Sequence, residues 1–134
     1  MQSAPDNLAA LINKGNLCLR IGDFSNAIPP LTRSLAVTNM YAARLDRALA
    51  YLQTGRLDAA EADYQEVLRA FPAVYGAYYG LGEIAWQNKD TNAAIRYYQR
   101  FLSNAVPRTE GFRAAAARLK SLQPEELKAT PEPP

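Results

Sequence analysis

Hydrophobic positions recur along the chain at the spacing of amphipathic helices that come in pairs. In the clearest pair, one amphipathic run ends near Tyr51, Gly55 interrupts the pattern, and a second run extends from Asp58 to Pro72. Asp58 and Glu61 have the spacing of a capping box, so we expect Asp58 to cap the second helix. A single helical hairpin cannot bury both of its apolar faces, and the pattern therefore predicts several stacked copies.

The helix pair repeats at a nearly constant interval. Ala27, Ala60 and Ala94 are separated by 33 and 34 positions. The same steps separate four further sets, which are Gly15, Ala48 and Gly82; Ser25, Asp58 and Asn92; Leu31, Tyr64 and Tyr98; and Leu35, Leu68 and Leu102. Ser25, Asp58 and Asn92 are residue types favoured at N-caps, so we expect each second helix to begin there. Five columns at one spacing are hard to obtain by chance, and they predict three repeats.

These columns resemble the tetratricopeptide repeat family, whose pattern of about 34 residues combines aromatic, Leu-Gly, Tyr, Ala and Pro positions. The matching residues are Gly15, Gly22, Ala27 and Leu31; Tyr51, Gly55, Ala60, Tyr64 and Pro72; and Tyr78, Leu81, Gly82, Ala94 and Tyr98. The departures are Lys14 and Arg47 in the leucine column, Arg44 in the aromatic column, and Lys89 where the other repeats have Gly22 and Gly55. The resemblance implies an all-α fold: a right-handed α-solenoid of three helix-turn-helix repeats with a C-terminal capping helix, seven helices in all.

The predicted organisation follows from this register. It consists of an N-terminal lead-in (1–7), three repeats (8–40, 41–74 and 75–108), a capping helix (109–122) and a Pro-rich disordered tail or linker (123–134). The predicted repeat helices are 6–21, 30–38, 41–53, 58–70, 73–87 and 91–103. The last predicted helix, 109–122, carries Phe112, Ala115, Leu119 and Leu122 on one stripe, as a cap requires. Pro29 and Pro30 would each cost about 3 kcal/mol inside a helix, so we expect a distorted start to the second helix.

The composition offers little chemistry beyond protein binding. The net charge is +2, whereas a nucleic-acid-binding domain would concentrate many cations on one face, so no nucleic acid is expected. The chain has no His and one Cys, Cys18, which is expected in the core; the common metal sites are therefore absent and no cofactor is expected. General acid-base catalysis would need a positioned pair of titratable groups, which the spacing does not suggest, so we expect no enzyme.

The family resemblance implies that the first helix of each repeat lines a concave groove. The candidate partner-binding residues are Asn13, Asn16, Arg20, Asp46, Leu49, Gln53, Gly76, Tyr79, Gly80, Glu83, Trp86 and Gln87. Tyr79 and Trp86 belong to the residue types that most often dominate interfaces. Gly76 and Gly80 leave a bare strip, which would admit either a ligand backbone or the helix of the preceding repeat; the sequence leaves both open.

One subclass of the family can be tested directly. Repeats that grip the acidic C-terminal tail of heat-shock chaperones use a two-carboxylate clamp of Lys, Asn and Arg side chains. The corresponding positions here are Ile12, Asn16, Asp46, Gly76 and Gly80. Only Asn16 matches, and Asp46 would repel a carboxylate, so a partner of this clamp type is not expected.

The sequence therefore favours a non-catalytic adaptor or scaffold that binds a peptide or protein surface in the groove and recruits it to a larger assembly. The alternative is a structural, self-associating or cytoskeleton-associated subunit, similar to kinesin light chains, that uses its outer helices and a basic contact at Arg113, Arg118 and Lys120. No apolar run is long enough to span a bilayer and no signal peptide is evident. The cytoplasm is favoured; a periplasmic or membrane-anchored location would apply if an N-terminal segment had been removed.

Overall fold

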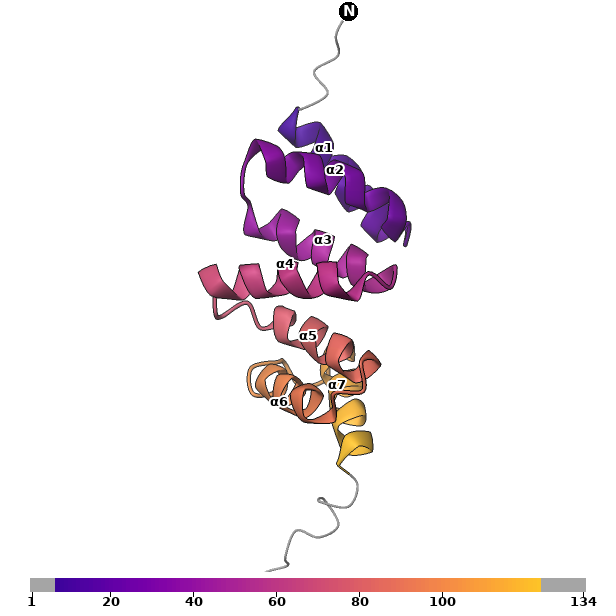
Figure 1. Ribbon diagram of the computed structural model, residues 1–134, viewed down its shortest axis with the longest axis vertical. Helices are drawn as coiled ribbons and strands as arrows, with labels where there is room; N and C mark the ends of the chain where they lie inside the picture. The colour runs from indigo at the N-terminus through magenta and orange to yellow at the C-terminus, as the bar shows by residue number, and fades with distance from the viewer. Residues whose placement is uncertain (1–6, 124–134) are drawn as a thin grey trace, which may run out of the picture.

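The computed structural model describes residues 7–123, which form seven α-helices and no strand. The helices are α1 (Leu8–Arg20), α2 (Phe24–Val37), α3 (Tyr41–Gln53), α4 (Leu57–Ala70), α5 (Gly76–Gln87), α6 (Thr91–Leu102) and α7 (Glu110–Leu122). They stack in chain order along one long axis (Figure 1). The predicted all-α solenoid is confirmed. Most of the predicted lead-in and tail, residues 1–6 and 124–134, lies outside the described residues.

The core is a series of layers between successive helix pairs, as a repeat fold requires. Ala27, Ala60 and Ala94 occupy the same position in three separate clusters, and each is 0% exposed. Small residues in the first helices let the second helices approach closely. A Cβ atom added to Gly15 would lie 2.7 Å from Leu31, and one added to Gly82 would lie 2.8 Å from Tyr98. The residues that recur at the repeat interval are therefore those through which the helices contact each other.

The prediction for the N-caps of the second helices was wrong by two positions. The observed caps are Asp23, Arg56 and Asp90, while Ser25, Asp58 and Asn92 lie in the first helical turn. Asp90 caps with its side chain, which accepts a hydrogen bond of 3.2 Å from the Ala93 amide. No side-chain cap is formed at the start of α4, so the capping box predicted from Asp58 and Glu61 is not present.

The reason is the shortness of the turn between the two helices of a repeat. One residue of each turn has a left-handed backbone: φ is 78° at Gly22, 80° at Gly55 and 61° at Lys89. This conformation ends the first helix of the repeat. One further residue then serves as the cap, and the next helix begins at once. Lys89 adopts the conformation that glycine provides at no cost in the other two repeats.

The helix α2 is continuous through Pro29 and Pro30, contrary to the predicted distorted start. Each proline leaves one carbonyl of the preceding turn without its helical donor, and those carbonyls belong to the exposed Ser25 and Asn26, where water can reach them. Pro30 is itself buried, together with Ala27, Ile28 and Leu31. Apolar packing on this face thus offsets the lost hydrogen bonds.

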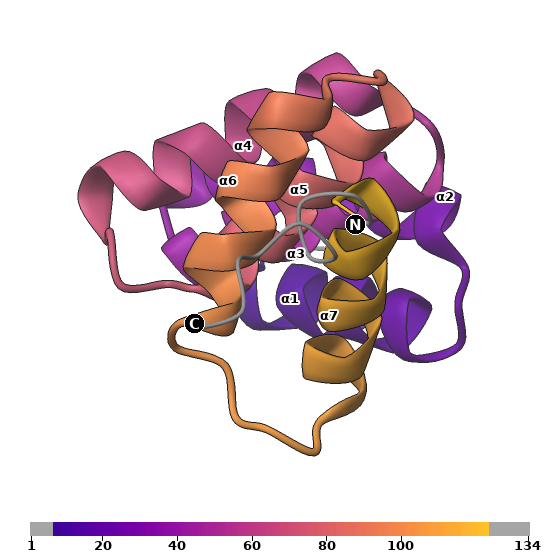
Figure 2. The same ribbon diagram turned by 90° about the horizontal axis from the view of Figure 1, so that it is seen from below.

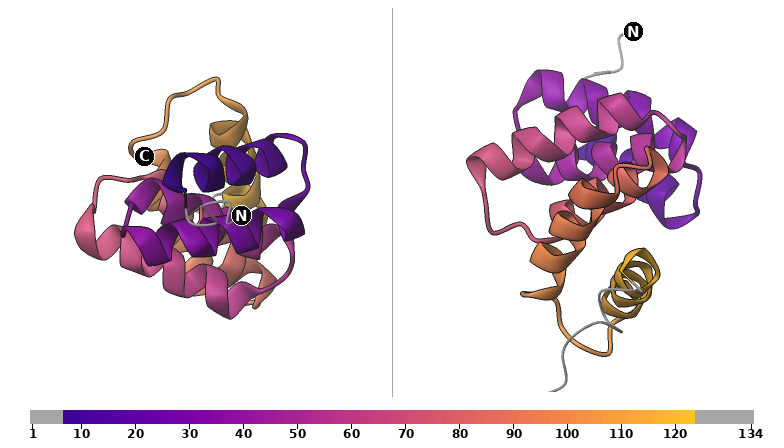
Figure 3. Two further views of the ribbon diagram at one scale, coloured as in Figure 1. Left: turned by 90° about the horizontal axis from the view of Figure 1, so that it is seen from above. Right: turned by 60° about the horizontal axis from the view of Figure 1, so that its bottom comes forward.

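The last helix, α7, covers the end of the stack. Thr109 caps it by accepting a 3.2 Å hydrogen bond from the Phe112 amide. Its buried residue Ala115 packs in the cluster that contains Ala94 and Tyr98, and Leu119 and Leu122 pack against the same cluster. Viewed along the stack, α7 and α1 lie toward one side and α4 toward the other (Figure 2), and α7 is joined to α6 by a long loop (Figure 3).

Candidate functional site

A hollow of about 600 Å³ lies between α3 and α5, and we call it the α3–α5 hollow. Its lining residues are Leu49, Leu52, Gln53, Gly55, Tyr64, Gly76, Tyr79, Gly80, Glu83, Gln87 and Phe101. Seven of these, Leu49, Gln53, Gly76, Tyr79, Gly80, Glu83 and Gln87, are among the predicted groove residues. The helical periods of α3 and α5 bring them to one surface, as the spacing predicted, although no ligand tests their role.

Two glycines of α5 shape this hollow in different ways. A Cβ atom added to Gly80 would lie 2.2 Å from Cζ of Tyr64, so Gly80 admits a side chain of the preceding repeat. A Cβ atom added to Gly76 would meet nothing within 4 Å. Of the two readings left open by the sequence, packing against repeat 2 therefore applies at Gly80, while Gly76 keeps its side of the hollow open.

Glu83 forms the polar wall of the α3–α5 hollow. Tyr98 Oη donates a 2.5 Å hydrogen bond to Glu83 Oε1, and Arg118 Nη2 lies 3.3 Å from Glu83 Oε2. Burial, and after it the hydrogen bond to Glu83, raises the pKa of Tyr98, so the phenol remains a proton donor at neutral pH. The carboxylate of Glu83 is thus already satisfied from the side of α6 and α7.

Trp86 lies one turn further along α5 and faces a different space. Its side chain is 39% exposed and lines a second hollow of about 620 Å³ with Gln87, Lys89, Thr91 and Leu122. The guanidinium carbon of Arg118 lies 3.6 Å from the centre of the Trp86 ring. The structure therefore places Trp86 beside α7 and outside the lining of the α3–α5 hollow.

The remaining predicted residues line neither of these two spaces. Asn13, Asn16 and Arg20 are exposed on α1, and none of them lines the α3–α5 hollow. Asp46 is half-buried on α3, and burial raises the pKa of its carboxyl group. On α7, Arg113 and Lys120 are exposed, whereas Arg118 turns inward to Glu83 and Trp86.

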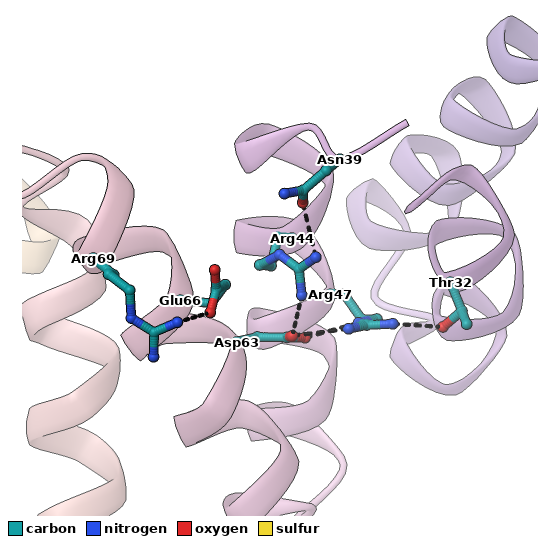
Figure 4. A network of polar contacts seen from close by, with 7 residues as sticks. All are labelled: Thr32, Asn39, Arg44, Arg47, Asp63, Glu66 and Arg69. Carbon is teal, nitrogen blue, oxygen red and sulfur yellow. Dashed lines mark hydrogen bonds and ion pairs between the residues drawn. The ribbon is translucent and has the colours of Figure 1, made fainter. Parts of the chain in front are cut away.

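A buried ion cluster between α3 and α4 was not anticipated from the sequence (Figure 4). Asp63 is 3% exposed and receives two hydrogen bonds of 2.8 Å from Arg47, while Arg44 Nη1 lies 3.3 Å away. Arg47 also donates to Thr32 of α2 and Arg44 donates to Asn39. Arg44 and Arg47 were noted as departures from the family pattern; together with an acid on the apolar face of α4, they were the available signal.

The described residues contain no cluster of three or more side chains suited to hold a metal ion. Cys18 is a free thiol in the core. None of the described helices combines the length and the apolar character that a membrane span requires. The chemistry that residues 7–123 offer is therefore concentrated in hydrogen bonding, apolar contact and the charges named above.

Comparison with known proteins agrees with this architecture. The tetratricopeptide repeat family model matches residues 45–107. The chain is 37% identical over 70 residues to DnaJ homolog subfamily C member 3 of Mus musculus and 36% identical to its Homo sapiens counterpart. These matches cover 52% of this chain but only 14% of the length of those relatives, so they describe a shared segment.

Solved structures are similar over most of the chain. The first tetratricopeptide repeat domain of Spaghetti (RPAP3) bound to an HSP90 peptide has a TM-score of 0.75 at 21% identity and covers 91% of this chain and 94% of that one. The second such domain of human RPAP3, in complex with an HSP70 peptide, has a TM-score of 0.72 at 21% identity and covers 87% and 98%. The Sgt2 domain from Aspergillus fumigatus has a TM-score of 0.74 at 20% identity and covers 95% and 85%. At these identities the likeness establishes the fold.

Proposed function

Because this chain is a tetratricopeptide repeat protein, we propose that it is a non-catalytic adaptor that holds a peptide or a protein segment in the α3–α5 hollow. The observation that carries the proposal is the composition of that hollow. Leu49, Leu52 and Phe101 supply apolar surface, and Tyr79 supplies an aromatic ring at its edge. The hollow joins this apolar surface to polar side chains, and a concave site that combines apolar contact with a few polar groups is the usual form of a binding site.

The polar groups of the hollow suit recognition of a peptide backbone. Gln53 ends α3 and Gln87 ends α5, and both side chains are exposed where they line the hollow. An amide side chain both donates and accepts hydrogen bonds, as an extended backbone requires. Glu83, the acid in the lining, is engaged by Tyr98 and Arg118, which leaves it poorly placed to act as a general base. These features support binding without catalysis.

The structural relatives that bind chaperone peptides do not transfer that ligand to this chain. Recognition of paired carboxylates depends on cations that hold them by charge-assisted hydrogen bonds. Neither Lys nor Arg occurs among the residues lining the α3–α5 hollow. We therefore propose that the partner is a protein segment other than a chaperone tail of the two-carboxylate type.

The alternative function, association with itself or with a filament through the outer helices and the basic end, has weaker support. It relied on Arg113, Arg118 and Lys120, and Arg118 is committed to Glu83 inside the molecule. Static light scattering over a range of concentrations separates the two functions. A mass that grows with concentration supports self-association, whereas a constant monomer mass supports the adaptor.

The adaptor proposal can be tested by filling the hollow. Peptides are selected from a random library on the immobilised protein, and the dissociation constants of the selected peptides are then measured for three proteins: the wild type, Gly76→Trp and Ala62→Trp. Gly76 lines the hollow with open space beside it, and Ala62 is an exposed residue of α4. We expect Gly76→Trp to weaken binding at least ~10-fold, which is ~1.4 kcal/mol. Ala62→Trp should leave binding nearly unchanged, and equal affinity for all three proteins would refute the site.

A further inference from the structure

We propose that the groove selects segments in which an arginine or lysine is flanked by apolar residues, and that Asp46 is the carboxylate that receives the cation. This inference rests on the proposed function, since it names the class of ligand for the same groove. It assigns a specific role to one residue of α3 that has no partner within the described part of the chain. The apolar flanks would enter the neighbouring α3–α5 hollow.

The position of Asp46 follows from the geometry of α3. Asp46 precedes Leu49 by three residues and Gln53 by seven, and both of these line the α3–α5 hollow. At 100° per residue, seven residues return to within about 20° of the starting direction. Asp46 therefore continues the stripe of Leu49 and Gln53 toward the start of α3, and a peptide that leaves the hollow along this stripe passes it.

Three inward-facing acids, Asp46, Asp63 and Glu83, differ in whether a cation pairs with them. Asp63 is neutralised by Arg44 and Arg47, and Glu83 is neutralised by Arg118. For Asp46, no hydrogen bond or ion pair is formed with any residue in the range 7–123. Its carboxyl group is nevertheless half-buried, and the desolvation raises its pKa. A half-buried carboxylate without a counter-charge is strongly stabilised when a bound partner supplies a cation.

The charge of the surroundings favours the same class of ligand. The residues that line the α3–α5 hollow include Glu83 but neither Lys nor Arg. Arg20, a cation among the predicted groove residues, is the last residue of α1 and forms no ion pair with Asp46. A segment bearing a carboxylate would meet the like charge of Asp46, whereas a cation would find a carboxylate with free acceptor sites. Leu49 and Leu52 then supply the contact for its apolar neighbours.

The test uses a library of random nonapeptides with acetylated and amidated ends, so that no terminal charge contributes. The library is selected on the full chain as wild type, as Asp46→Asn and as Glu61→Gln, a matched control in which an exposed acid of α4 is neutralised. We expect the wild type and Glu61→Gln to enrich Arg or Lys at one position between apolar residues, and Asp46→Asn to lose this enrichment. Circular dichroism shows that the near-isosteric variants are folded.

A double-mutant cycle then quantifies the contact. The best peptide and its Arg→Gln or Lys→Gln form are measured against the wild type and Asp46→Asn. We expect the peptide change to weaken binding to the wild type at least ~10-fold but to alter binding to Asp46→Asn by less than about twofold. Equal losses for both proteins would overturn the role of Asp46.

The outcomes also separate this inference from the function on which it rests. If the selected peptides carry acidic or uncharged residues and do not bind Gly76→Trp, the groove binds peptides but the inference about a cation is wrong. If enrichment of cations survives Asp46→Asn, the cation binds elsewhere and the inference is again wrong. If no peptide is enriched, or if Gly76→Trp has no effect on those that are, the proposed function itself fails.

Discussion

The guanidinium carbon of Arg118 lies 3.6 Å from the centre of the Trp86 ring, which places a cation from α7 directly against an aromatic side chain of α5. The same guanidinium reaches Glu83, one turn earlier on α5, at 3.3 Å. Arg118 therefore joins the last helix to the repeat that forms the α3–α5 hollow. Because Trp86 is the single tryptophan of the chain, this contact can be followed by intrinsic fluorescence.

Arg118→Ala should loosen α7. The substitution removes a cation–π contact and a partly exposed ion pair, which together are worth about 1–2 kcal/mol. We expect amide hydrogen exchange in α7 to accelerate and quenching of Trp86 by acrylamide to increase. Arg113→Ala is the matched control, since Arg113 is exposed on the same helix and should change neither signal. Equal behaviour of the two variants would show that Arg118 does not hold α7.

Asp63→Asn should destabilise the fold strongly. The carboxylate is buried and accepts hydrogen bonds of 2.8 Å from Nε and Nη2 of Arg47, so the substitution leaves the guanidinium groups of Arg44 and Arg47 without their counter-charge. Breaking a buried ion pair from one side costs about 3–5 kcal/mol. Denaturation by urea measures the loss as a fall in the free energy of unfolding.

The control for Asp63 is on the same helix. Glu66 pairs with Arg69 at the surface, and the arginine side chain is 73% exposed (Figure 4). Exposed pairs contribute about 0–1 kcal/mol, so Glu66→Gln should have little effect. Similar losses for Asp63→Asn and Glu66→Gln would contradict the assignment of Asp63 as a structural anchor.

Gly80→Ala and Gly76→Ala should change stability in opposite directions. At Gly80 the added methyl group would overlap the ring of Tyr64, which is 3% exposed, and displacing this packed ring should cost about 1–3 kcal/mol. At Gly76 the methyl group meets nothing, and replacing glycine in a helix should stabilise by about 0.4–1 kcal/mol. Thermal denaturation of the pair gives the comparison. A neutral Gly80→Ala would show that Tyr64 does not fill this space.

Asp46→Asn should raise stability at neutral pH. Burial raises the pKa of Asp46 above its ordinary value of 3.8, so the folded state binds the proton more tightly than the unfolded state does. The resulting stabilisation is complete below pH 3.8 and is lost as the pH rises through the folded-state pKa, where the charged carboxylate bears the desolvation cost. Urea denaturation of both proteins should show an advantage of Asp46→Asn at neutral pH that shrinks as the pH falls through the folded-state pKa and is smallest below pH 3.8. A constant difference would mean that the charge of Asp46 is not the cause.

The repeat register could be predicted from the sequence because small residues recur wherever two helices of a repeat pack closely together. Gly15 faces Leu31 and Gly82 faces Tyr98 within the same repeat, and the fully buried alanines recur at the repeat interval. Helix bounds such as Tyr41–Gln53 follow from the apolar period and agree with the prediction. Seven of the predicted groove residues share one hollow for the same reason, since helical spacing fixes which side chains lie on one face.

Features that depend on contacts between helices could not be read in this way. The inward turn of Arg118 depends on where α7 docks, and the sequence shows only a cation beside an apolar stripe. Asp63 appears as one acid among several on α4 until Arg44 and Arg47 are placed opposite it. The N-caps were misplaced because residue preference favoured Asp58, whereas the left-handed turn at Gly55 sets the start of α4 at Leu57.

The most direct measurement of the central claim is a ¹H–¹⁵N correlation titration of the labelled chain with one selected peptide. The claim is that the ligand lies in the α3–α5 hollow, so the largest amide shift changes should fall on Leu49, Gln53, Gly76, Tyr79 and Gln87. Largest changes on the outer surfaces of α2, α4 and α6, or around Arg113 and Lys120, with the amides of the hollow unmoved, would contradict the account.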